Sequence, residues 1–214
     1  TTRAETGGRP CCGSPGQKWR KNMDNTENKE LFLSTFRKNV QRPGAEKLLA
    51  WMETTDFFTA PASTRFHAAY EGGLLDHSMN VYNVLISKHF DPASDDIESF
   101  TIVSLLHDLC KAGFYKTELR NRKNDRGEWE KVPVYTVDDQ FPYGHGEKSV
   151  YLIERFMRLR TEEAMAIRWH MGGFDESVKG GSFALAHAFE KYPLAVKLHL
   201  SDLEATYLHE NRSE

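Results

Sequence analysis

The sequence predicts an all-α helical bundle that carries one inserted β-hairpin. Apolar residues recur at helical spacing along most of the chain, and Gly, Pro and Asp divide these stretches into helix-sized pieces. Between about residues 114 and 141 the pattern changes to alternation around a turn signal. The 214 residues, 39% of them hydrophobic, suffice for one domain with a core, which we place at residues 23–214.

Strong breakers separate the predicted helices. Pro43-Gly44 ends the first helix, Gly72-Gly73 precedes the third, and Asp91-Pro92 ends the third. Ser94-Asp95-Asp96 would cap the fourth helix, which carries His107-Asp108. Helices are predicted at residues 25–39, 45–54, 74–89, after residue 96 through 105–111, and at 144–159, 161–171, 184–191 and 193–209, with a loop at 59–70.

The hairpin is predicted from two alternating stretches, residues 116–122 and 129–137, on either side of Asn124-Asp125-Arg126-Gly127. Its charged residues are mixed in sign. A solvated hairpin accounts for this composition. The alternative is a substrate-facing flap or a dimer arm, and the dimer arm would make the chain a homodimer.

Composition restricts the classes of function. No apolar run approaches the ~20 residues of a membrane helix, and no apolar stretch typical of a signal peptide occurs near residue 1. Three cysteines do not make a disulfide framework, which favours a reducing cytoplasm. Residues 1–22, rich in Gly, Pro and Arg, are predicted to be a disordered tail or a non-native extension ahead of Met23.

The net charge of −3 is unevenly distributed. Basic residues dominate positions 1–22, so the remainder of the chain is more acidic than the total suggests. An acidic body argues against broad binding of duplex DNA, which depends on neutralising many phosphates. A phosphorylated small molecule or a short oligonucleotide in a local groove is compatible with this charge.

His107-Asp108 is the centre of the candidate site. The pair lies inside an apolar run in which Leu105 and Leu109 recur at helical spacing, so the sequence predicts a buried helix. Burying an imidazole beside a carboxylate without a partner is costly, and a metal ion would partner both. Lys111, three residues after Asp108, would share its helix face.

Other helices supply further candidate ligands among the nine histidines. His77 and His170 lie on apolar helix faces, and His145 begins a helix between two glycines. Asp202 lies on an apolar face of the last helix. Each such residue alone is explained more simply as a satisfied core residue, but their convergence in one bundle is how helical folds build metal centres.

This donor set indicates a transition metal. Imidazoles with shared carboxylates favour Fe, Mn, Co, Ni or Zn over Ca. Four histidines and two aspartates exceed what one ion takes while a position stays open for water, so we predict two divalent ions. Two ions ~3.5–4 Å apart can activate a hydroxide and hold both oxygens of an in-line displacement.

The ordered pattern H…HD…H…H…D resembles the HD-domain superfamily of metal-dependent phosphohydrolases. It is similar to the two-metal subset shared by HD-GYP cyclic-dinucleotide phosphodiesterases and the HD module of some bacterial 3′→5′ exoribonucleases. Cys110 stands where the family's HD-x-G-K motif often has Gly, and no GYP signature is present. The resemblance is carried by residues 72–78 (GGLLDHS), His107-Asp108 with Lys111, residues 144–146 (GHG), residues 168–170 (RWH) and Asp202.

The resemblance implies a role for each matching residue within an HD helical bundle. His77, His107 and Asp202 would hold one metal ion, and His145 with His170 the second. Asp108 would bridge the two ions and serve catalysis. Lys111 would contact a phosphate oxygen, where a fixed cation stabilises charge that develops on the phosphoryl group.

The predicted function is a metal-dependent phosphohydrolase or phosphodiesterase that cleaves a nucleotide, cyclic nucleotide or short oligonucleotide through a metal-bridging hydroxide. Arg65 and His67, which precede the His77 helix, are candidates for substrate binding, with structural hydrogen bonds as the alternative. One alternative function is a mononuclear nucleotide phosphatase. The other is a non-catalytic nucleotide-binding sensor that retains the pocket.

Overall fold

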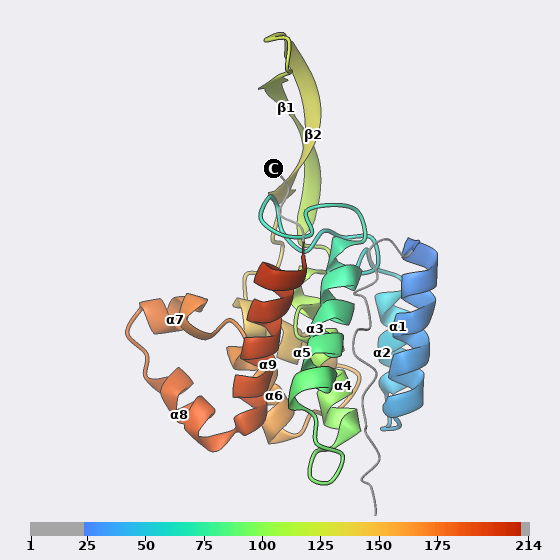
Figure 1. Cartoon of the computed structure of the whole chain (residues 1–214), viewed down its shortest axis with the longest axis vertical. Coiled ribbons are helices and arrows are strands. Elements are labelled where there is room, and N and C mark those ends of the chain that lie inside the picture. Colours follow the sequence, from blue (N-terminus) through green and yellow to red (C-terminus); the bar gives the residue numbers. More distant parts are fainter. Residues whose placement is uncertain (1–23, 211–214) are drawn as a thin grey trace, which may run out of the picture.

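The structure, a computed structural model, describes residues 24–210 (Figure 1). Residues 1–23 and 211–214 lie outside the described part, so the prediction of a disordered tail or non-native extension at 1–22 also lies outside it. Among the described residues, no helix combines the length and apolar character needed to cross a membrane.

The described residues form a mainly helical domain with one antiparallel hairpin, as the sequence predicted. The hairpin consists of β1 (Tyr115–Lys123) and β2 (Trp129–Val137). Three short turns of other helix types lie at Leu109–Lys111, Gly172–Phe174 and Ala205–His209. The α-helices are α1 (Asn25–Asn39), α2 (Ala45–Met52), α3 (Gly73–His89), α4 (Ile97–Leu106), α5 (His145–Glu154), α6 (Thr161–Trp169), α7 (Glu176–Lys179), α8 (Ala184–Lys191) and α9 (Pro193–Glu204).

The core is centred on α4. This helix is buried from Ser99 to Leu106, as expected for a helix that is apolar on nearly all sides. It packs against α1, α3, α6 and α9, and α3 also packs against α9. The hairpin projects from one end of this bundle, beside the loop that leads into α3 (Figure 1).

The prediction of a continuous helix through residues 105–111 was wrong. The α-helix ends at Leu106, and Asp108 adopts φ −100° and ψ 20°, outside the helical region. The backbone N–H of Cys110 donates to Ser149 Oγ of α5 rather than continuing the helix. The chain therefore bends at Asp108, but Lys111 still lies on the same side as Asp108, with its Nζ 2.6 Å from Asp108 Oδ2.

Other boundaries also differ from the prediction. α5 ends at Glu154 rather than at residue 159, and α6 ends at Trp169 rather than at residue 171. The short helix α7 occupies part of the loop expected between α6 and α8. The last α-helix was predicted to continue to residue 209. It ends at Glu204, and a π-helical turn follows at Ala205–His209.

A buried ion network holds the end of the bundle where α4 and α6 begin. Arg42, in the turn between α1 and α2, donates to Glu163 Oε2 at 2.7 Å and to Glu98 Oε2 at 3.0 Å. Glu163 is fully buried and also accepts from Ser99 Oγ at 2.6 Å. These hydrogen bonds tie α4, α6 and the turn between α1 and α2 together around charges that would be costly if left unpaired.

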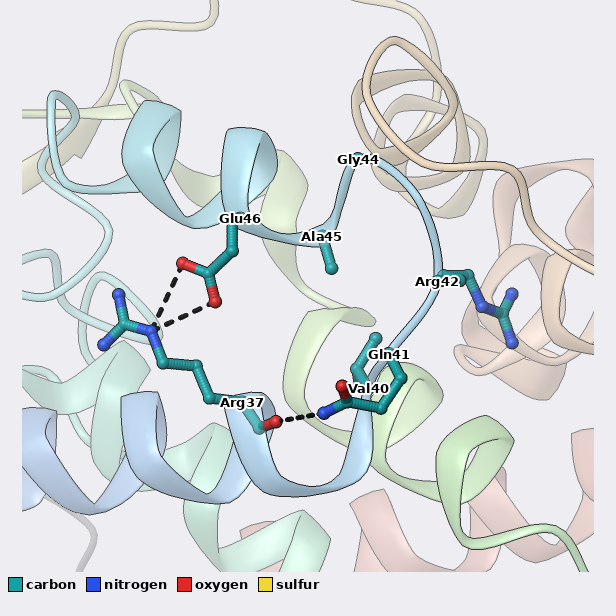
Figure 2. A pocket seen from close by; sticks show the side chains of 7 residues that line it. All are labelled: Arg37, Val40, Gln41, Arg42, Gly44, Ala45 and Glu46. Carbon is teal, nitrogen blue, oxygen red and sulfur yellow. Dashed lines mark hydrogen bonds and ion pairs between the residues drawn. The ribbon is translucent and has the colours of Figure 1, made fainter.

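A hollow lies at the same turn, between α1 and α2. In Figure 2, Arg37 is directed at Glu46 and Gln41 at the backbone of Arg37, whereas Arg42 points away from them. Arg37 Nε lies 3.1 Å from Glu46 Oε1, and Gln41 Nε2 donates to Arg37 O at 2.6 Å. Residues between Arg37 and Glu46 line the hollow, and none of the predicted site residues is among them.

Candidate metal centre

Five helices bring the predicted ligands together at one end of the bundle. His77 lies in the first turns of α3 and Asp202 near the end of α9. His107 and His170 directly follow α4 and α6, and His145 is the first residue of α5. Because α4 and α6 both end at the cluster, the negative ends of their dipoles favour a cation there.

Two glycines let neighbouring backbone segments pack closely enough for these ligands to converge. A Cβ atom on Gly146 would lie 2.3 Å from the carbonyl oxygen of Arg168, so α5 could not approach α6 as closely with any other residue. A Cβ on Gly73 would lie 1.9 Å from the oxygen of Ala68. Both glycines therefore fix the positions of the neighbouring ligands His145 and His77.

One set of donor atoms gathers around His77. Its Nε2 lies 3.1 Å from His107 Nε2, 3.3 Å from Asp202 Oδ1 and 3.5 Å from Asp108 Oδ2. One ligand atom from each of His77, His107 and Asp202 falls within 4.8 Å of the others, a spacing that could hold a metal ion. The side chains of both histidines are almost completely buried.

A second set gathers around the other oxygen of Asp108. Oδ1 of Asp108 lies 2.8 Å from His145 Nε2 and 3.5 Å from His170 Nε2. Asp108 also belongs to two further groups with metal-ligand spacing, one with His107 and His170 and one with Cys110 and His145. Its two carboxylate oxygens thus face two different sets of imidazoles.

The second ring nitrogen of each histidine has its own partner. His107 Nδ1 lies 2.8 Å from the carbonyl oxygen of Ser104, and His170 Nδ1 lies 2.7 Å from that of Ile167. A carbonyl accepts only, so both Nδ1 atoms carry the proton and both Nε2 atoms present a lone pair to the cluster. Such partners orient metal-binding imidazoles in proteins.

Side chains supply the same support for the other two histidines. His77 Nδ1 lies 2.8 Å from Glu210 Oε1, and His145 Nδ1 lies 3.4 Å from the Sγ atom of Cys110. Neither Glu210 nor Cys110 was predicted to contact the cluster. Glu210 carried no signal because it lies 133 positions from His77 in the chain.

The charges of the cluster depend on one another. Burial opposes protonation of His77, but the carboxylates of Glu210 and Asp202 outweigh it and raise its pKa to about 10. Burial likewise opposes protonation of His145, and Cys110 and Asp108 raise its pKa to about 10. Without metal, these imidazoles therefore hold protons in the place that cations would take.

Asp108 and His107 show the opposite behaviour. Burial disfavours the Asp108 carboxylate, but the cations around it, Lys111 first, hold its pKa well below the usual range. Burial lowers the pKa of His107 to about 3 despite the neighbouring Asp108. At neutral pH the centre therefore offers an anionic carboxylate and a neutral imidazole, the forms that bind metal.

Lys111 lies at the rim of the cluster. Its Nζ is 2.6 Å from Asp108 Oδ2, and its side chain is 12% exposed. Burial alone would lower the pKa of Lys111, but the carboxylate of Asp108 raises it above the usual value, so the ammonium stays charged. His145 is the most exposed imidazole of the cluster at 29%, so the centre opens on the side of His145 and Lys111.

The other two residues predicted for substrate binding, Arg65 and His67, lie in one loop. The half-buried ring of His67 has its centroid 5.2 Å from that of His77, which places it beside the cluster. Ser63 Oγ fixes this position, because it accepts from the N–H of His67 and donates to its carbonyl oxygen. Arg65 is exposed, and its guanidinium lies over the ring of Phe66.

The donor set fits metal ions. In the described part of the chain, His170 Nε2 is a buried nitrogen without a hydrogen-bond partner. The Nε2 of His107 faces that of His77 while its own proton is committed to Ser104. A buried lone pair without a donor is costly, and a cation beside His170 Nε2 would satisfy it.

No protein-family model matches the chain, and neither curated proteins nor solved structures contain a significant match to it. The assignment of a function therefore depends on the geometry of the cluster and on the residue pattern. The structure shows a mainly helical domain with a buried His/Asp cluster that could bind metal.

Proposed function

We propose that the protein is a metal-dependent phosphohydrolase that cleaves a phosphoester of a nucleotide, cyclic nucleotide or short oligonucleotide. The observation that carries this proposal is the position of Asp108, whose two oxygens face two separate sets of imidazoles. A carboxylate in this position is suited to bridge two ions, the arrangement that many phosphate-ester hydrolases use. The resemblance of the motif order to the HD superfamily supports the same activity.

Each set of donors would hold one divalent ion. His77, His107 and Asp202 would bind one. His145 and His170, which both face Oδ1 of Asp108, would bind the other, and Asp108 would contact both. Bound ions would supply Lewis acidity and a water nucleophile of lowered pKa. Fe, Mn, Co, Ni and Zn all suit imidazole-rich ligation.

The protein's own groups have defined tasks in such a reaction. Lys111 keeps its charge at the rim and would donate to a phosphate oxygen, which stabilises charge that develops on the phosphoryl group. His67 would line the substrate side from the adjoining loop. The thiol of Cys110 is buried against His145, so its position suits support of that ligand rather than nucleophilic attack.

Turnover by metal-loaded protein tests the proposal. Protein stripped of metal and reloaded with Mn²⁺ or Fe²⁺ should hydrolyse at least one member of a panel of nucleotides, cyclic dinucleotides, short oligonucleotides and the small diester bis(p-nitrophenyl) phosphate. Chelation should remove this activity and reloading should restore it. Tight binding of a nucleotide without turnover would instead identify a sensor, and full activity with one ion per chain would identify a mononuclear phosphatase.

A further inference from the structure

The hairpin has two unlike faces. Directly opposed residues of an antiparallel pair share a face, as do alternate residues of one strand. The register pairs Lys123 with Trp129 and Tyr115 with Val137, which assigns every side chain of both strands. The face that we call the aromatic face includes Tyr115, Leu119, Lys123, Trp129, Lys131 and Tyr135.

The aromatic face leaves large apolar groups in water. Trp129 is 69% exposed and Leu119 is 66% exposed. On the opposite face, by contrast, Val132 and Val134 are half-buried among charged neighbours. An isolated two-stranded hairpin is only marginally stable, and a row of exposed apolar side chains marks an interaction surface.

The aromatic face begins at the metal centre. Tyr115 is four positions from Lys111, and its hydroxyl donates to the carbonyl oxygen of Ala62 in the loop that carries His67. The strands are nine residues long, so the face extends roughly 30 Å outward from there. A ligand lying along it would have one end beside Lys111 and the cluster.

The charges of the aromatic face favour an anionic ligand. Within the two strands this face carries Lys123 and Lys131 and no carboxylate. The opposite face is mixed in sign, with Glu118 and Glu130 among Lys116, Arg120 and Arg122. Lys123 Nζ lies 5.3 Å from the centre of the Trp129 ring. Aromatic side chains for base stacking, interleaved with cations for the backbone, are the groups by which proteins bind single-stranded nucleic acids.

We infer that the aromatic face binds a single-stranded oligonucleotide and directs one end of it into the metal centre. This inference rests on the proposed phosphohydrolase function and selects the oligonucleotide from its substrate classes. The acidic body of the chain would repel a duplex that spread beyond the hairpin. At the base of the aromatic face, the carboxylate of Glu71 lies near Tyr135. Lys111 is the cation at that end that would contact a phosphate of the oligonucleotide.

A matched pair of charge reversals tests the inference. Lys123→Glu with Lys131→Glu reverses the aromatic face, and Arg120→Glu with Arg122→Glu makes the same charge change on the opposite face. Binding of a fluorescent oligonucleotide of about 12 nucleotides, within the range of known single-strand sites, is measured by anisotropy. The full-length chain is used without metal, so that the oligonucleotide is not cleaved, and thermal unfolding checks each variant.

We expect the aromatic-face reversal to weaken binding by on the order of tenfold and to reduce its salt dependence, with the opposite-face reversal within about twofold. Trp129→Ala should also weaken binding, with little change in salt dependence, because it removes stacking alone. Equal losses in both reversals, or none in either, would overturn the inference. So would self-association that Trp129→Ala abolishes in a protein that binds no oligonucleotide.

Turnover of bis(p-nitrophenyl) phosphate by the wild-type protein separates the two proposals. If the small diester is cleaved but the oligonucleotide is not bound, the inference about the hairpin fails and the proposed function stands. If the oligonucleotide binds through the aromatic face but no phosphoester is cleaved, the surface is established and the proposed function fails.

Discussion

At the end of the bundle where α4 and α6 begin, Arg42 lies between Glu98 and Glu163, each within 3.0 Å. At the end where the same helices finish, the Nε2 atoms of His107 and His170 lie within 3.6 Å of Asp108, and that of His170 has no hydrogen-bond partner. Both ends bury charged groups. The first end pairs its cation with carboxylates inside the chain, whereas the second leaves a buried nitrogen without a partner, so only the second calls for a ligand.

The largest effect is expected from Asp108→Asn, which keeps the side chain's size and removes its charge. Loss of the shared anion should abolish turnover and lower the metal content of the purified protein, because both sets of imidazoles depend on it. Metal analysis and steady-state kinetics measure the two effects. Full metal occupancy in this variant would contradict a bridging Asp108 even if activity were lost.

Glu163→Gln tests the opposite end of the bundle. Arg42 would keep Glu98 but lose its fully buried partner, which should cost about 3 kcal/mol of unfolding free energy. For a domain of this size that corresponds to a fall in Tm of roughly 10 °C. Below the transition, metal content and kcat should match the wild type, and a lower metal content would show that the two ends are coupled.

A smaller effect is expected from the carboxylate behind His77. Glu210→Ala should lower metal affinity by about 10- to 100-fold, because the imidazole loses the group that orients it. Glu210→Gln can still accept a hydrogen bond from Nδ1 and should lose less affinity. Glu204→Gln is the matched control, since Glu204 pairs with Lys88 and His209 instead. Equal affinities in Glu210→Ala and Glu204→Gln would remove Glu210 from the centre.

The smallest effect concerns pH and His67. Burial, with the cationic His77 next, lowers the pKa of His67 from 6.5 to about 4 in the folded protein. Between these values the unfolded chain binds more protons, so this residue's contribution to stability is complete above pH 6.5 and is lost as the pH falls toward 4.

Denaturant unfolding of metal-free protein across this range measures the difference between wild type and His67→Gln. The wild type should lose more stability than the variant as the pH falls from 6.5 to 4. Parallel profiles would mean that His67 is solvated in the folded protein, away from His77.

The order of helices and the identity of the candidate ligands could be predicted because both depend on local patterns. His77 and His107 lie in apolar stretches with helical spacing, and His145 stands between glycines. The outer partners could not be predicted in this way. Glu210 reaches His77 only through the π-helical turn after α9, and Cys110 reaches His145 only because the chain bends at Asp108.

The sequence also placed the hairpin but not the difference between its faces. Its mixed charges suggested a solvated ribbon. The register then separates Lys123 and Lys131 from Glu118 and Glu130, because one residue of register decides the face of every side chain. A pattern of charges along a strand becomes informative only when the partner strand is aligned with it.

The most direct test of the account is the electron paramagnetic resonance spectrum of metal-stripped protein titrated with Mn²⁺. Two ions bridged by Asp108 would lie about 3.5–4 Å apart, so two equivalents should bind and produce the spectrum of an exchange-coupled pair. Asp108→Asn should abolish the coupling. Uptake of fewer than two ions, or a spectrum of isolated Mn²⁺ at saturation, would contradict a two-metal centre at this end of the bundle.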